Sequence, residues 1–181
     1  MAEDIYAKLR EKIDRYSVGM GATESGKEIK ILKRLFTENE AKVYIGMTRS
    51  LESAKTISSR VGMETAEVKS HLDSMTDKGL TFPKTKDGVR YYAAAPFMHG
   101  FFEHQVFRKV KDPEIPALFE DYIMGGFIPK TTSMRTVPVM AEVDAKDTVL
   151  PYDDVREIIK SKERIGLFGC ACNYQVKQMG S

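Results

Sequence analysis

Two residues near the end of the chain have the type and spacing that most clearly suggest chemistry. They are Cys170 and Cys172, the only cysteines in the sequence. Thiolates bind zinc and iron–sulfur clusters, and two sulfurs at i and i+2 can hold one metal ion or two irons of one cluster. Such sites usually take four protein ligands, so the pair is half of a site. We expect the other ligands beyond Ser181 or on a second chain; alternatively, the pair forms a redox disulfide or consists of inert buried thiols.

The three histidines do not complete this site. His99 and His104 are separated by a spacing of i, i+5, which does not place both on one helix face, and His71 lies elsewhere in a predicted helix. The sequence contains no Ser-His-Asp signature, phosphate-binding glycine loop or HExxH motif. The residues therefore do not indicate an enzyme that makes and breaks covalent bonds.

Residues 1–36 are predicted to be helical. Apolar residues at i, i+4 and i+8 predict an amphipathic helix over 4–16. Ser25 and Glu28 have the spacing of a capping box and predict the start of a second helix, which ends near residue 36.

Residues 37–95 predict one recognisable fold. Thr37-x-x-Glu40 is a second capping box that opens a helix, and two further helices follow, the last beginning at Thr65. Strand patterns on both sides of Asp87-Gly88 predict a β-hairpin with a favoured two-residue turn. Helix, helix, short turn, helix and hairpin is the order of a winged helix-turn-helix.

The third helix of such a module would read DNA, but the charge of the segment supports this weakly. Residues 37–95 contain nine basic and eight acidic residues, and residues 65–78 have a net charge of −1. DNA binding depends on Lys and Arg that neutralise phosphates. The alternative is an interaction or dimerisation scaffold. The candidate DNA contacts are Thr65, Lys69, Ser70, Lys84, Lys86 and Arg90.

Residues 35–44, LFTENEAKVY, resemble the first helix of the winged-helix regions in sugar-responsive and MarR-like prokaryotic regulators. An L-T-x-x-E-A-x-V-Y pattern is usual there. The resemblance implies a fold class more than a particular ligand or operator.

The rest of the chain completes an α+β fold. Aromatic residues crowd 96–127 and predict a helical connector that belongs to the core or to a dimer interface, and not to a cofactor pocket. Over 128–181 we expect a small αβ unit that leads into a truncated cysteine-rich region. Its predicted elements are a strand at 137–143, a helix that begins at Pro151 and has an apolar inner face, and a short strand at 165–168.

Part of this unit resembles the region that joins a winged helix to ferredoxin-type modules in anaerobic prokaryotic iron–sulfur proteins. The similar segments are 135–139 (RTVPV), 150–159 (LPYDDVREII) and 169–173 (GCACN). Family members continue with a C-x-C-R start and a ferredoxin domain with two [4Fe–4S] clusters; Asn173 stands where arginine is usual.

The resemblance implies that this chain is the N-terminal part of a longer electron-transfer or redox-sensing protein, in which Cys170 and Cys172 are cluster ligands. Two thiolates do not hold a cubane, so we expect a [4Fe–4S] cluster in the full-length protein and no intact cluster in this fragment. The alternative function is a winged-helix transcriptional regulator whose Cys pair binds zinc or acts as a thiol switch. A third is a protein-interaction scaffold with inert cysteines.

Bulk composition is that of an ordinary globular protein. The chain has 181 residues, of which 42% are hydrophobic and 30% charged, and a net charge of +2. Two cysteines are not a disulfide framework, which favours the reducing cytoplasm, and no apolar run resembles a signal peptide or a membrane span. Expected partners are a second copy, through the apolar helices at 4–16 and 113–124, DNA, and a redox protein, but no membrane.

Overall fold

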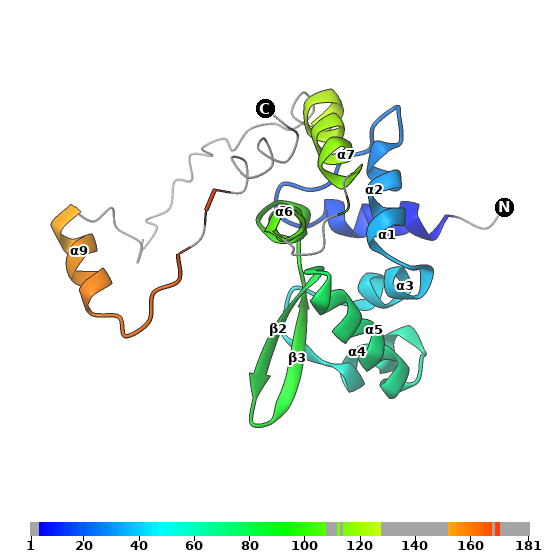
Figure 1. The fold of residues 1–181 in the computed structure, drawn as a ribbon. Coiled ribbons are helices and arrows are strands. Elements are labelled where there is room, and N and C mark those ends of the chain that lie inside the picture. The colour runs from blue at the N-terminus through cyan, green and yellow to red at the C-terminus, as the bar shows by residue number, and fades with distance from the viewer. Residues whose placement is uncertain (1–3, 108–111, 113, 128–151, 168, 171–181) are drawn as a thin grey trace, which may run out of the picture. The chain divides into compact units, whose positions relative to one another are not determined.

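The computed structural model describes residues 4–107, 112, 114–127, 152–167 and 169–170 (Figure 1). Within this part of the chain there are eight α-helices and one three-stranded antiparallel sheet, so the structure is α+β. The described residues fall into two compact units, 4–127 and 152–170, and each is considered by itself.

The first unit contains seven α-helices, three strands and two short segments, η1 and η2, of which η1 has a non-helical backbone at Met98, His99 and Gly100. In chain order these are α1 (Ile5–Asp14), α2 (Lys27–Leu35), α3 (Glu38–Gly46), β1 (Glu52–Ser53), α4 (Ala54–Val61), α5 (Thr65–Asp77), β2 (Thr81–Lys86), β3 (Val89–Ala94), η1 (Phe97–Phe101), α6 (Phe102–Phe107), α7 (Glu114–Tyr122) and η2 (Ile123–Phe127). The strand order in the sheet is β1-β3-β2, and the β2–β3 hairpin runs beside α4 and α5 (Figure 1).

The predicted capping box at the start of α3 is confirmed. The backbone N–H of Thr37 donates to Glu40 Oε2 at 2.8 Å, and the backbone N–H of Glu40 donates to Thr37 Oγ1 at 3.2 Å. These reciprocal bonds satisfy two donors that the first helical turn leaves without a partner in the helix. They fix where α3 begins, which in turn places Glu40 toward the interior.

The predicted hairpin is also confirmed. Lys86 of β2 faces Val89 of β3, so the connection contains two residues, Asp87 and Gly88. Both have a positive φ, 51° and 75°. Two successive residues with positive φ are what a tight type I′ turn requires, and Asp-Gly is one of the pairs that adopts it most easily.

The predicted capping box at the start of α2 is wrong. Gly26 precedes the helix with a left-handed φ of 62°, and no side chain caps it. The Lys27 N–H instead donates to Thr23 Oγ1 at 3.3 Å, and Thr23 Oγ1 donates to Glu28 Oε2 at 2.5 Å. The left-handed turn at Gly26 therefore brings Thr23, and not Ser25, to the start of α2.

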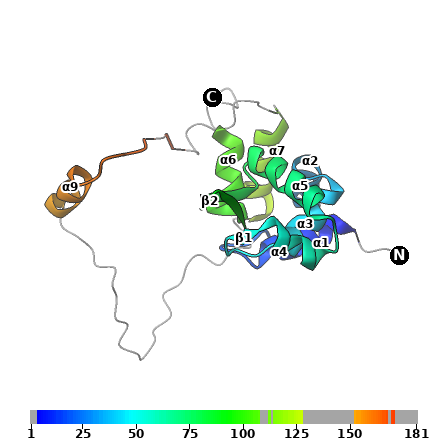
Figure 2. The same ribbon diagram turned by 90° about the horizontal axis from the view of Figure 1, so that it is seen from below.

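One hydrophobic core extends through the first unit, from Tyr6 of α1 to Tyr122 of α7. Phe97 lies 6.0 Å from Phe119 and 5.6 Å from Tyr122, measured between ring centroids. Helices α6 and α7 lie beside one another (Figure 2), and Phe102 packs edge to face on Phe119 at 5.1 Å. The aromatic residues at the start of the predicted connector are therefore core residues.

The apolar faces of α1 and α7 belong to the same core. Leu9 and Ile13 of α1 are fully buried, and so is Tyr122 of α7, whose hydroxyl donates to the carbonyl of Gly21 at 2.9 Å. The surfaces that the sequence offered to a second copy thus contact other helices of the same chain.

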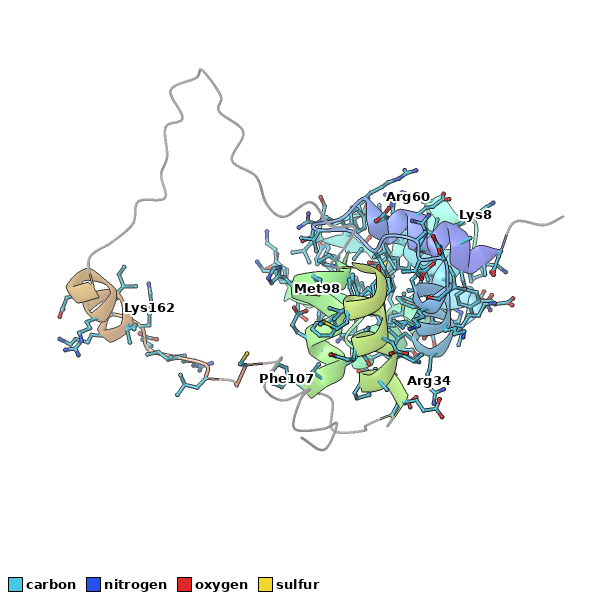
Figure 3. The ribbon with its side chains drawn as sticks, turned by 90° about the horizontal axis from the view of Figure 1, so that it is seen from above. Lys8, Arg34, Arg60, Met98, Phe107 and Lys162 are labelled. Atoms are coloured by element: carbon cyan, nitrogen blue, oxygen red, sulfur yellow. The ribbon has the colours of Figure 1, made fainter. Side chains whose placement is uncertain are left out.

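An ion-pair cluster joins α2 to the start of α7 at the surface. Arg34, labelled in Figure 3, donates through Nη2 to Asp112 Oδ1 at 2.9 Å and lies 2.7 Å from Glu114 Oε2 through Nη1. The Asp112 carboxylate also accepts the Glu114 N–H at 3.0 Å, in the first turn of α7. One arginine thus holds the start of α7 against α2.

The second unit contains the predicted helix as α9 (Tyr152–Lys160), in which Ile158 and Ile159 are exposed. The strand predicted at 165–168 is not formed over residues 165–167, where Leu167 is 94% exposed. A strand needs a partner for its backbone N–H and C=O groups, and the described part of this unit provides none. The strand predicted at 137–143 lies outside the described residues.

None of the helices in the described ranges combines the length and the apolar character that a membrane crossing requires.

Candidate nucleic-acid interface

Helix α5 separates its buried and exposed residues as the sequence pattern predicted. Val68, Leu72 and Met75 are fully buried against the core. Lys69 and Ser70 are exposed on the other side of the helix, and Thr65 is exposed at the first residue of α5. An α-helix has about 3.6 residues per turn, so the helical period turns Lys69 and Ser70 away from the buried stripe. Thr65 is one and two turns before Val68 and Leu72 and is not separated from them by the period.

Thr65 makes a contact within the protein at the turn between α4 and α5. Its Oγ1 lies 2.9 Å from Oγ of Ser58, which is 5% exposed. The Ser58 hydroxyl also contacts the carbonyl of Lys55 at 2.9 Å. This hydrogen-bonded pair connects the two helices, so Thr65 has a structural role in addition to the DNA contact predicted for it.

Asp73 is the centre of a polar cluster between α5 and β3. Its Oδ2 accepts a hydrogen bond from Lys69 Nζ at 2.6 Å. Its Oδ1 accepts from Arg90 Nη1 at 2.9 Å and from the Tyr92 hydroxyl at 2.7 Å. One carboxylate therefore receives a donor from α5 itself and two donors from the neighbouring strand; we call these four residues the Asp73 cluster.

The electrostatics of the Asp73 cluster favour the carboxylate form of Asp73. Partial burial opposes ionisation, but hydrogen bonds from Lys69 and Tyr92 and the charges of Lys69 and Arg90 lower the pKa of Asp73 below its ordinary value. Burial and the hydrogen bond to Asp73 raise the pKa of Tyr92 to about 12. At neutral pH Asp73 is thus charged and Tyr92 is a neutral donor.

The hairpin separates the three predicted DNA contacts that it carries. In an antiparallel pair, residues directly opposite one another share a face of the sheet. Arg90 is opposite Thr85, whereas Lys84 and Lys86 are opposite Tyr91 and Val89. Lys84 and Lys86 are therefore exposed on the face opposite to the one on which Arg90 reaches α5.

A third basic residue, on α4, is also held by a carboxylate. Arg60 of α4, labelled in Figure 3, donates through Nη2 to Glu52 Oε1 at 2.5 Å, and its Nη1 donates to the carbonyl of Gly46. The hydrogen bond from Arg60 is the main reason why the pKa of Glu52 is lowered; further bonds come from Thr48. Arg60 was not predicted as a contact, and its charge is compensated within the protein.

The three histidines have separate surroundings. His71 lies 3.7 Å from the Glu67 carboxylate, and the ring of His104 lies 6.1 Å from that of Phe82. Glu103 accepts the backbone N–H of His99 at 3.0 Å, which is a structural contact at the start of α6. No cluster of three or more His, Cys, Asp or Glu suited to a metal ion occurs among the described residues.

The predicted cysteine site is described in part. Cys170 is exposed, in a segment that is neither helix nor strand, and Cys172 lies outside the described residues. One described thiol is fewer ligands than a tetrahedral zinc ion or a [4Fe–4S] cluster takes. The described residues therefore do not by themselves fit either group.

The surface made by α5 and the hairpin carries the residues that the sequence predicted as DNA contacts. It brings Lys69 and Arg90 together on one carboxylate and keeps Lys84 and Lys86 apart from them. The i, i+4 spacing of Lys69 and Asp73 could have revealed half of the Asp73 cluster in the sequence. Comparisons with protein-family models, with curated proteins and with solved structures found no match, so the interpretation of this surface depends on its own geometry.

Proposed function

We propose that residues 37–95 are a winged helix-turn-helix that binds duplex DNA, with α5 as the recognition helix and the β2–β3 hairpin as the wing. The observation that carries the proposal is the sheet order β1-β3-β2. A short strand before α4 pairs with the second strand of the hairpin, Glu52 with Tyr92 and Ser53 with Tyr91. This pairing brackets α4 and α5 and leaves α5 exposed next to the hairpin, as a groove-reading helix requires.

The two lysines of the hairpin are the main phosphate contacts in this proposal. Lys84 and Lys86 are two residues apart on a strand, so they share a face and both are exposed. Each phosphate that a protein neutralises contributes about 0.9 to the slope of log K against log salt concentration. Two contacts predict binding that is weak and clearly salt-dependent, consistent with the small net charge of the module.

The test is the binding of a labelled duplex, followed by fluorescence anisotropy between 50 and 200 mM salt. The double variant Lys84→Ala/Lys86→Ala should reduce the slope of log K against log salt concentration by about 1.8. If wild type and variant bind equally at 1 M salt, this difference makes the variant bind roughly sixtyfold more weakly at 0.1 M salt. The control Lys8→Ala/Lys30→Ala removes the same charge from α1 and α2 and should change both quantities far less. Absence of salt-dependent binding by the wild-type chain would refute the proposal, and an equal loss in the control would refute the role of the hairpin.

Iron–sulfur redox chemistry is a second proposal, which the exposure of Cys170 favours because an exposed thiol is not a buried hydrophobic side chain. Cys170 and Cys172 would then contribute two of the ligands and a longer chain the others. The test is anaerobic purification of the uninterrupted gene product, with iron, sulfide and zinc analysis. Absorbance near 400 nm that is lost in Cys170→Ser would support a cluster, zinc without colour would support a structural zinc site, and metal-free protein would refute both.

A further inference from the structure

The Asp73 cluster lies within the surface proposed to bind DNA and compensates part of its charge. Lys69 and Arg90 are two of the four basic residues predicted to contact DNA, and both donate to the same carboxylate. The side chains of Lys69 and Arg90 are 58% and 39% exposed, so both cations reach the solvent from which a phosphate would approach. Asp73 itself is 30% exposed and is thus accessible on the same surface.

In this arrangement the Asp73 carboxylate and a DNA phosphate would compete for the same two cations. A phosphate that approaches Lys69 or Arg90 must replace hydrogen bonds that Asp73 already accepts, and it is repelled by the Asp73 charge. Because the three groups together have a net charge of +1, they can release fewer counterions from DNA than two separate cations would. The carboxylate therefore reduces both the affinity for DNA and the steepness of its dependence on salt.

We propose that Asp73 is an internal competitor of the DNA phosphates, an affinity-limiting residue that occupies Lys69 and Arg90 until a phosphate displaces it. The inference depends on the proposed function of the α5 surface and specifies how that surface is regulated. It also assigns Tyr92 a part: its hydroxyl donates to the same oxygen as Arg90, which holds the carboxylate in position between the two cations. Tyr92 is 1% exposed, so this donor is supplied from the interior.

The size of the effect follows from the charge that is removed. Asp73→Asn keeps a carbonyl oxygen to accept the Tyr92 hydroxyl but removes one negative charge from the cluster. One additional phosphate contact steepens the slope of log K against log salt concentration by about 0.9. If two proteins bind equally at 1 M salt, this difference corresponds to about eightfold in affinity at 0.1 M salt. We therefore expect Asp73→Asn to bind a labelled duplex about eightfold more tightly than wild type at 0.1 M salt.

Three variants distinguish competition at the cluster from a general effect of charge. Asp77→Asn makes the same charge change at the exposed C-terminal end of α5 and should raise the affinity by less than about threefold, because screening weakens a charge outside the cluster. Asp73→Glu keeps the negative charge and should retain the wild-type affinity. Lys69→Gln should lower the DNA affinity about twofold in the wild-type background, where Asp73 already compensates the Lys69 charge, and about eightfold in the Asp73→Asn background. This non-additivity measures the competition.

The measurements use the full chain, salt titrations of each variant, and circular dichroism to verify its fold. A tighter and more salt-dependent Asp73→Asn, with little change in Asp77→Asn, supports the inference. Unchanged or weaker binding by a folded Asp73→Asn, or an equal gain in affinity in Asp77→Asn, overturns the inference about Asp73. If the wild-type chain still binds the duplex in that case, the proposed function stands. If Asp73→Asn does not fold, equal eightfold losses for Lys69→Gln and Lys84→Ala in the wild-type background overturn it. Absence of salt-dependent binding by both wild type and Asp73→Asn overturns the proposed function, and the inference with it.

Discussion

Replacement of Lys78 by methionine should reveal how much of the fold depends on one buried ion pair. Lys78 follows the end of α5, and its Nζ donates to both oxygens of Glu40, at 2.8 and 2.7 Å. The Glu40 side chain is only 2% exposed, whereas that of Lys78 is 27% exposed. Methionine keeps most of the length of the lysine side chain but removes its charge, so Lys78→Met leaves a buried carboxylate without its cation.

The size of the loss follows from the contacts that remain. Removal of one partner from a fully buried ion pair typically costs about 3 to 5 kcal/mol. The cost here should be lower, because Lys78 is partly hydrated and Glu40 still accepts from Ser74 Oγ and from the Thr37 N–H, each at 2.8 Å. We expect the free energy of unfolding to fall by about 2 to 3 kcal/mol at pH 7.

The loss should also depend on pH. In wild type, burial opposes ionisation of Glu40, but hydrogen bonds from Lys78, Thr37 and Ser74 lower its pKa below the ordinary value of 4.5. Glu40 thus contributes stability that is present above the pKa of the unfolded chain and is lost as the pH falls through the lower pKa of the folded state. In Lys78→Met the remaining effect of burial favours protonation, so the variant should lose less stability relative to wild type at pH 4 than at pH 7.

Urea unfolding at the two pH values measures both effects. Lys42→Met, on the exposed side of α3, is the matched control and should change stability by less than about 0.5 kcal/mol. Glu40→Gln/Lys78→Met should be more stable than Lys78→Met alone, because the uncompensated charge is gone. A loss below about 0.5 kcal/mol at pH 7, or one that grows toward pH 4, would show that the pair does not stabilise the fold in this way.

Two further substitutions test the packing of the first unit. Gly79→Ala should lower the free energy of unfolding more than Gly62→Ala does. Gly62 has a left-handed φ of 68° in open space, so we expect its substitution to cost about 1 to 2 kcal/mol. Gly79 has a φ of 73°, and a Cβ there would also lie 2.5 Å from Cβ of His104. Equal losses in thermal unfolding would argue against the clash. Phe119→Ala should cost about 3 to 5 kcal/mol because Phe119 is 1% exposed among aromatic rings, whereas Leu118→Ala on the same helix should cost clearly less; similar urea midpoints for the two variants would contradict this account of the core.

Features that depend on residues close together in the chain could be predicted. The α3 capping box needs only Thr37 and Glu40, three residues apart, and the hairpin turn needs only Asp87-Gly88. Their hydrogen bonds and dihedral angles are decided within one turn of backbone, so the residue types are sufficient. The helical period likewise predicted which side of α5 is buried.

The prediction failed where nearby groups compete or where a partner is needed. The spacing of Ser25 and Glu28 predicted a cap, but Gly26 between them is left-handed and the Lys27 N–H donates to Thr23 instead. The strand expected at 165–168 had suitable apolar residues, but residue type cannot supply a neighbouring strand, and none pairs with residues 165–167 in the described structure.

The candidate interface shows the same limit in its electrostatics. Exposure of Lys69 followed from the helical period, but its compensation did not, because Arg90 and Tyr92 reach Asp73 across 17 and 19 residues of chain. A count of charges along the sequence treats Asp73 as one acid among several. The structure shows that its charge is directed at two of the cations on which DNA binding would depend.

Two carboxylates hold α5, and their different burial implies different roles. Glu40 connects α3 to the C-terminal part of α5 through Ser74 and to Lys78 just beyond it, and it is inaccessible to any ligand. Asp73 connects α5 to β3 through Arg90, and it lies partly in solvent. The Glu40 carboxylate is 2% exposed and needs its cation inside the fold, whereas Lys69 and Arg90 are exposed and can exchange a carboxylate for a phosphate. Loss of the Glu40 cation should therefore appear as a loss of stability, and loss of the Asp73 charge mainly as a gain in DNA affinity.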